Sequence, residues 1–265
     1  MANNTISFKG VDARQIWDHL QSRPEPIQRL SESEGKRVLR MGPYVLRRFA
    51  YALNSFATLA ELYAAGMPVE KPLLLIEGEG LPTLITEYVE GENYINVLLE
   101  ETNPQAKMKK LGECLYLFHS CGYFVSDSHP KNYIISDSPD SKAIRIDVNT
   151  VQKFPKDAWN DWDDDALAIG TVDIRDCILV PIAHYLATEK RVEALDDVVL
   201  AILDGYTHDR QSKMVAMAIT RYVKDVKSMI EEAEKSGKDF ASVYRDKVIQ
   251  DIRNGKIKQI ATFEK

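Results

Sequence analysis

The stretch from Leu115 to Val151 constrains this chain more than any other part of it. Asp127 is followed five residues later by Asn132, and an apolar triplet, residues 133–135, comes next. After a polar turn, a second strand-like run, residues 143–146, ends at Asp147. Two short strands joined by a turn are therefore predicted to bring two acidic side chains and one carboxamide to one edge.

The order of acid, carboxamide and acid suits a site that holds a metal-bound phosphate donor. Phosphoryl transfer needs Mg²⁺ ions that bridge the donor phosphates and a carboxylate that orients the attacking hydroxyl. Mg²⁺ prefers oxygen ligands, often one or two carboxylates together with phosphates and waters. Asp127, Asn132 and Asp147 are therefore the candidate catalytic residues. The alternative is a chance grouping of turn residues.

The motif DSHPKN followed by IRIDVN resembles the catalytic loop and the metal-binding Asp of the protein-kinase-like fold. Its D-x-H-P-x-N form is closer to aminoglycoside, choline and lipopolysaccharide-core sugar kinases than to ordinary protein kinases. The lead-in LFHSCGYFVSD is similar to that of the same enzymes. The resemblance implies ATP and Mg²⁺ as cofactors, Asp127 as general base, and Asn132 and Asp147 as metal ligands.

The same resemblance implies an α+β, two-lobed fold with a small antiparallel sheet lobe, carrying one helix, and a larger, mainly helical lobe. Residues 26–89 are predicted to form the small lobe and residues 90–265 the large lobe of one catalytic unit. Residues 1–25 form an N-terminal extension with a short helix that begins near Asp12, interpreted as a cap or a partner-binding segment.

Three antiparallel strands are predicted at residues 26–30, 36–41 and 44–49. Strand alternation puts Val45 and Arg47 on one face and Arg48 on the other. By resemblance, Arg47 stands where these kinases have the lysine that holds the donor phosphates, with Arg48 as second candidate. The alternative is two arginines on an exposed edge. The first turn, SESEGK, has one glycine and two glutamates where these kinases have a glycine-rich flap.

The segment 52–66 has helical periodicity and ends at Gly66, a suitable C-cap. It matches the kinase helix that usually offers a glutamate to the strand lysine, but Ser55 stands near the expected position. Glu61 is the acidic residue of this helix, and it is interpreted either as the partner of Arg47 or as a solvated side chain.

The segment 67–91 is predicted to form two strands, and it resembles the hinge region of sugar and aminoglycoside kinases. In this comparison the backbone from Glu87 to Val89 meets the adenine, and Gly91 begins the larger lobe. A clear amphipathic helix at 103–120 follows and ends near His119, which is predicted to be a packed structural residue rather than a proton carrier.

The rest of the chain is predicted to be mostly helical, with Gly205, Gly237 and Gly255 as helix stops. Asp176 resembles the buried aspartate that ties the catalytic loop to the large lobe. The acidic run Asp163–Asp165 is interpreted as solvated, with cation binding as the alternative.

Composition narrows the class of protein. The 265 residues are 45% hydrophobic and 28% charged, as in ordinary globular proteins. The net charge of −6 argues against nucleic-acid binding, and no apolar run is long enough to span a bilayer. The first residues lack the pattern of a signal peptide, which predicts a cytoplasmic location, with secretion by a route without such a signal as the alternative.

Together these features predict transfer of the γ-phosphate of ATP to a hydroxyl group. The predicted acceptor is a sugar, with a protein acceptor second, and a protein partner is a further possibility. Two alternatives stay open: a pseudokinase that serves as a binding scaffold, and a kinase-fold enzyme that transfers AMP.

Overall fold

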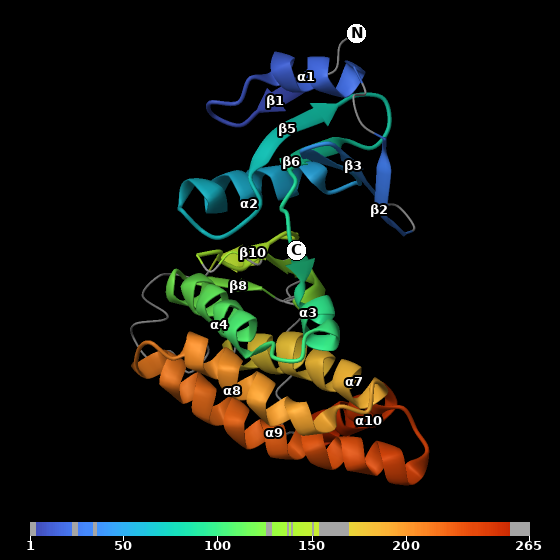
Figure 1. Ribbon diagram of the computed structural model, residues 1–265, viewed down its shortest axis with the longest axis vertical. Helices are drawn as coiled ribbons and strands as arrows, with labels where there is room; N and C mark the ends of the chain where they lie inside the picture. Colours follow the sequence, from blue (N-terminus) through green and yellow to red (C-terminus); the bar gives the residue numbers. More distant parts are fainter. Residues whose placement is uncertain are drawn as a thin grey trace.

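The computed structural model describes residues 4–22, 26–33, 36–125, 129–136, 138, 140–149, 151–153 and 170–254. The elements form a sheet lobe and a mainly helical lobe, drawn at the top and bottom of Figure 1. The predicted α+β, two-lobed architecture is therefore confirmed.

One antiparallel six-stranded sheet forms the centre of the small lobe, with the order β1-β5-β6-β4-β3-β2. Its strands are β1 (Asn4–Ser7), β2 (Gln28–Ser33), β3 (Lys36–Met41), β4 (Tyr44–Arg48), β5 (Pro72–Glu77) and β6 (Thr83–Glu87). The edge strand β1 was not predicted; it pairs with β5 and brings the start of the chain into the sheet.

Helices α1 (Ala13–Ser22) and α2 (Ala52–Ala64) cover opposite faces of this sheet. Ile16 and Leu20 of α1 pack in one cluster with Leu74, whereas α2 packs in the main core, which contains Leu75. Adjacent residues of a strand point to opposite faces, so one strand serves both helices. The described part of the predicted N-terminal extension, residues 4–22, thus contributes a strand and a covering helix to this lobe.

The helical lobe begins with β7 (Glu92–Asn93), α3 (Tyr94–Glu100), α4 (Gln105–Ser120) and β8 (Tyr123–Val125). The 3₁₀ turn η1 (Pro130–Asn132) leads into β9 (Tyr133–Ile135), and β10 (Ile144–Arg145) and β11 (Val151–Lys153) follow. Strands β9 and β10 are antiparallel, which confirms the predicted pair of strands around a turn. Gly91 has φ +136°, and a Cβ there would lie 2.3 Å from the Ile135 carbonyl oxygen, so this entry to the lobe requires glycine.

The rest of the described helical lobe contains the π-helical segment η2 (Asp173–Leu179), α7 (Val180–Thr188), the 3₁₀ turn η3 (Val192–Ala194), α8 (Leu195–Tyr206), α9 (Arg210–Ser236) and α10 (Phe240–Arg253). In the described part of the chain, none of the helices combines the length and the apolar character that crossing a membrane requires. The predicted acidic run at 163–165 lies outside the described residues.

Two glycines set the contact between α4 and α8. A Cβ at Gly112 would lie 1.9 Å from the Ile202 carbonyl oxygen, and a Cβ at Gly205 would lie 1.9 Å from the Lys109 carbonyl oxygen. Helix α8 ends at Tyr206, one residue after Gly205, so the predicted end is nearly correct, but Gly205 is itself helical and allows the two backbones to touch. Gly237 does end α9, with φ +67°. Gly255 lies outside the described residues.

Candidate functional site

Arg47 forms a buried ion pair at the centre of the sheet lobe. Its Nη1 atom lies 2.6 Å from Oε2 of Glu70 and 3.3 Å from the Thr86 hydroxyl oxygen. The Thr86 hydroxyl donates to the same Glu70 oxygen over 2.8 Å. Arg47 is 8% exposed and Glu70 is 2% exposed. Val45 and Arg47 are both buried on one face of β4, which confirms that they share a face, and Glu70 supplies the opposite charge beside the buried guanidinium.

Glu70 is fixed to the strand that leads to Asp147. The Glu70 amide donates to the Arg145 carbonyl oxygen over 3.0 Å, and the Arg145 amide donates to the Pro68 carbonyl oxygen over 2.8 Å. Val69 and Arg145 form a parallel β-bridge between these two hydrogen bonds. Arg145 itself is fully buried and donates from Nη1 to the Tyr133 hydroxyl oxygen. The segment 68–70 therefore joins the sheet lobe to β10 through backbone contacts.

Burial and neighbouring charges together set the pKa of Glu70. Burial raises the pKa of Glu70, and the guanidinium of Arg47 opposes that rise. The negative charge of Asp147 adds to the rise, as the smallest of these causes. Arg47, Glu70 and Asp147 thus belong to one electrostatic cluster.

Asn132 and Asp147 are brought together by the β9 and β10 pair. The Ile146 amide donates to the Asn132 carbonyl oxygen over 2.9 Å, so the residue before Asp147 is tied to Asn132. Asp147 is half-buried, and its Oδ1 accepts the Asn149 amide over 3.3 Å. Asp127, the predicted general base, lies outside the described residues.

The side chains at this edge fit a Mg²⁺ site in their chemistry. The Asp147 carboxylate and the Asn132 carboxamide offer hard oxygen donors, and donor phosphates and waters would complete such a set. Among the described residues, no three His, Cys, Asp or Glu side chains gather as a complete metal-binding group.

Glu61 does not pair with Arg47, so that alternative is wrong. Its Oε1 accepts from Nζ of Lys153 over 2.7 Å and from the Tyr123 hydroxyl over 3.2 Å. The Lys153 hydrogen bond is the main cause of a lowered pKa at Glu61, whose side chain is 54% exposed. Helix α2 points Glu61 toward β8 and β11, away from the strand that carries Arg47.

Ser55, at the expected position of the helix glutamate, is buried and hydrogen-bonds instead to Oδ1 of Asn149. Asn149 follows Asp147 by two residues, and its amide contacts Asp147. Helix α2 therefore contacts the segment after Asp147 rather than the strand arginine.

The remaining predicted binding residues lie around this cluster. Arg48 is exposed on the opposite face of β4, where its Nε donates to the Leu81 carbonyl oxygen over 3.2 Å. Glu87 is exposed at the end of β6, and Val89 is half-buried beyond it. Between them, the Tyr88 amide donates to the Pro43 carbonyl oxygen over 2.7 Å. Arg48 is thus not brought to Glu70, and the hinge role of Glu87 to Val89 stays a prediction.

His119 is part of the packed core, as predicted. It is fully buried, with Nδ1 2.7 Å from the Tyr206 hydroxyl and Nε2 3.0 Å from Oδ2 of Asp173. Asp173, rather than Asp176, is the buried aspartate here. Asp176 is partly exposed and pairs with Arg175 at 2.6 Å, so its predicted buried position is wrong.

Glu70 was not among the residues that the sequence singled out. A usable signal was present, because an arginine on the buried side of a strand needs a nearby opposite charge. Glu70 is an acidic residue just before the apolar strand β5, where burial is to be expected. The resemblance instead implied a partner on the helix at residues 52–66, where Ser55 and Glu61 lie.

Comparison with known proteins bears on the fold. No family profile matches the chain, and a search of curated proteins found no match. Among solved structures, WaaP in complex with acyl carrier protein is similar with a TM-score of 0.54 and 13% sequence identity, over 86% of this chain and 99% of that chain. This likeness confirms the predicted protein-kinase-like fold.

Two structures of WbdD are also similar. The complex of WbdD with the kinase inhibitor LY294002 has a TM-score of 0.44 and 13% identity, over 73% of this chain and 49% of that chain. The bifunctional kinase-methyltransferase WbdD has a TM-score of 0.45 and 14% identity, over 74% of this chain and 51% of that chain.

Proposed function

We propose that this chain is an ATP- and Mg²⁺-dependent phosphotransferase that acts on a hydroxyl group, with a sugar of the lipopolysaccharide-core type as first acceptor. The observation that carries the proposal is the cluster of Arg47, Glu70 and Asp147, with Asn132 beside it. A buried cation, a carboxylate and a carboxamide at one junction of two lobes match the needs of a bound triphosphate. The protein-kinase-like fold supports this assignment.

Each residue has a distinct task in this proposal. Arg47 binds the donor phosphates, and its planar guanidinium contacts two oxygens at once. Asp147 and Asn132 would hold Mg²⁺, which neutralises the charge that develops on the transferred group. Asp127 orients the acceptor hydroxyl and accepts its proton as the oxygen attacks.

Two alternatives use the same fold differently. A scaffold without catalysis is motivated by the substitution of lysine by Arg47 and by the turn with one glycine between β2 and β3. Transfer of AMP would use the same nucleotide but release pyrophosphate rather than ADP. Product analysis therefore separates the three functions.

Removal of the metal should abolish the stabilisation of this protein by ATP. At 100 times its dissociation constant, a ligand that binds only the native state adds about 2.7 kcal/mol to the free energy of unfolding. For a chain of this size that corresponds to a rise in Tm of roughly 5–10 °C. The measurement is a thermal titration with ATP in Mg²⁺ and in EDTA, followed by product analysis with delipidated core oligosaccharide.

The product decides what a positive titration means. ADP together with a phosphorylated oligosaccharide supports the proposed reaction, and pyrophosphate with AMP-modified protein indicates the AMP transferase. Equal melting temperatures in ATP with Mg²⁺, ATP with EDTA and buffer alone would instead favour the scaffold.

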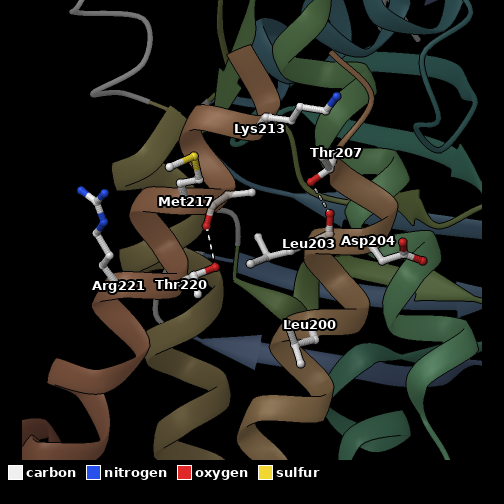
Figure 2. A pocket seen from close by; sticks show the side chains of 9 residues that line it. Leu200, Leu203, Asp204, Thr207, Lys213, Met217, Thr220 and Arg221 are labelled. Carbon is white, nitrogen blue, oxygen red and sulfur yellow. Dashed lines mark hydrogen bonds between the residues drawn. The ribbon is translucent and has the colours of Figure 1, made fainter. Parts of the chain in front are cut away.

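We also propose that a protein partner binds the groove between α8 and α9. Figure 2 shows Leu200 of α8 and Met217 of α9 along this groove, and they are 58% and 57% exposed. Lys213 and Arg221 line the same groove, whereas Asp204 there is neutralised by Lys109 at 2.7 Å. An apolar surface with surplus cations fits an amphipathic partner segment with acidic residues.

We propose acyl carrier protein as this partner, because WaaP was solved in complex with acyl carrier protein. Leu200→Asp should weaken binding of purified acyl carrier protein at least about tenfold, since it buries one more negative charge against an acidic partner. The measurement is isothermal titration calorimetry. Leu53→Asp, a matched control at a 46% exposed leucine of α2, should leave the affinity unchanged.

Equal affinity of both variants for acyl carrier protein would contradict the groove, and the absence of binding to wild type would contradict this partner. Neither result bears on phosphate transfer, because the groove lies on α8 and α9 of the helical lobe rather than at β10.

A further inference from the structure

We infer that Glu70 is the positioning residue for Arg47, and that it acts from the segment 68–70, whose backbone is hydrogen-bonded to β10, rather than from helix α2. This inference rests on the proposed function, because it concerns how the cation that binds the donor phosphates is held. In the kinase pattern that the sequence resembles, a glutamate on the helix after the third strand has this task. Here the corresponding helix offers Ser55 and Glu61, and neither is bonded to Arg47.

The contacts of Glu70 favour a positioning role. Its Oε2 accepts from both Arg47 and Thr86, so the guanidinium is held between a carboxylate and a hydroxyl. Thr86 lies on β6 and is fully buried. Buried, charge-assisted hydrogen bonds of this kind fix the orientation of a guanidinium and also balance its charge. Arg47 is therefore presented in one orientation before any nucleotide binds.

The attachment of Glu70 has a consequence for regulation. The Glu70 amide is hydrogen-bonded to the carbonyl oxygen of Arg145, two residues before Asp147. The carboxylate that holds Arg47 is therefore attached to the strand that leads to the proposed metal ligand. A shift of α2 would break the contacts of Ser55 with Asn149 and of Glu61 with Lys153, but not the ion pair. Helix displacement thus cannot disconnect Arg47 from its carboxylate in this chain.

The test compares the affinity for Mg²⁺-ATP with the affinity for adenosine. Glu70→Gln should weaken Mg²⁺-ATP binding about tenfold, because a charged hydrogen bond that orients Arg47 toward the phosphates is lost. Adenosine has no phosphates, so its affinity should stay within about twofold, a range equivalent to a few tenths of a kcal/mol. General damage to the fold would weaken both ligands. Calorimetry on the folded variants measures both affinities.

Two further variants keep the test decisive. Glu70→Asp keeps the buried negative charge but shortens its reach, so a folded protein with weakened Mg²⁺-ATP binding is expected even where Glu70→Gln fails to fold. Glu61→Gln removes the acidic side chain of α2 and should change Mg²⁺-ATP affinity much less than Glu70→Gln.

The outcomes separate this inference from the proposed function. If wild type binds Mg²⁺-ATP and both Glu70 variants bind it equally well, Glu70 is not the positioning residue, although the function stands. If Glu61→Gln weakens Mg²⁺-ATP binding more than Glu70→Gln does, the positioning residue lies on helix α2 and the inference is overturned. If wild type binds adenosine but not Mg²⁺-ATP, the proposed function fails and the inference fails with it.

Discussion

Asp147→Asn is expected to lower the rate of phosphate transfer from ATP at least about 10³-fold, the range seen when a group that stabilises charge on a transferring phosphoryl is removed. The substitution keeps the shape of the side chain and the acceptor for the Asn149 amide. It removes the negative charge that a divalent cation requires. ADP release in the presence of Mg²⁺ and the core oligosaccharide measures the rate.

Asp140→Asn is the matched control for this prediction. Asp140 is an exposed residue of the turn between β9 and β10, outside the strand pair that ties the segment before Asp147 to Asn132. We expect its rate and its Tm to match those of wild type. A comparable rate for Asp147→Asn and wild type would show that Asp147 holds no metal needed for transfer.

The local elements of this protein could be predicted because their signals are local. Alternation along residues 44–48 predicted that Arg47 and Arg48 lie on opposite faces of a strand, and the periodicity of residues 103–120 predicted a helix, which is observed as α4 with Phe118 in the core. These patterns depend on the period of a strand or helix and on little else. The strand pair around Asp147 was found for the same reason.

The partners of these elements could not be predicted from period alone. Glu70 lies 23 residues from Arg47 in the chain. The edge strand β1 pairs with β5, although most of the sequence of the small lobe lies between them. Which carboxylate reaches a buried cation is decided by the bridge between Val69 and Arg145, a contact between lobes. The resemblance implied a glutamate of the helix, Glu61, as the partner of Arg47. That prediction was wrong because the bridge holds Glu70, the residue after Val69, beside Arg47.

Gly205 illustrates a different limit. Glycine near the end of a helical pattern usually indicates a C-cap, since it adopts a left-handed conformation without strain. Gly237 follows that rule, whereas Gly205 is the second-to-last residue of α8, has no left-handed φ, and serves a contact with α4. The purpose of such a glycine is set by the neighbouring helix, which the local sequence does not specify.

Gly112→Ala should lower the free energy of unfolding by about 3 kcal/mol, at the upper end of the cost of overpacking. In an isolated helix alanine would be favoured over glycine by about 1 kcal/mol, so the sign of the effect depends on the contact. A Cβ at Gly112 would lie 1.9 Å from the Ile202 carbonyl oxygen and 2.9 Å from the Tyr206 nitrogen. Both atoms belong to backbone, which yields only if α4 and α8 separate. Thermal unfolding should show Tm reduced by roughly 6–12 °C.

Gly237→Ala separates this contact from the general effects of replacing glycine. Nothing lies within 4 Å of a Cβ at Gly237, and its φ of +67° is the main source of strain, so a loss of about 1 kcal/mol is expected. Because the reciprocal approach of Gly205 to Lys109 leaves α8 no room to slide, α4 cannot relieve the clash by a small shift. A Gly112→Ala protein as stable as wild type would mean that the two helices cross farther apart than this geometry requires.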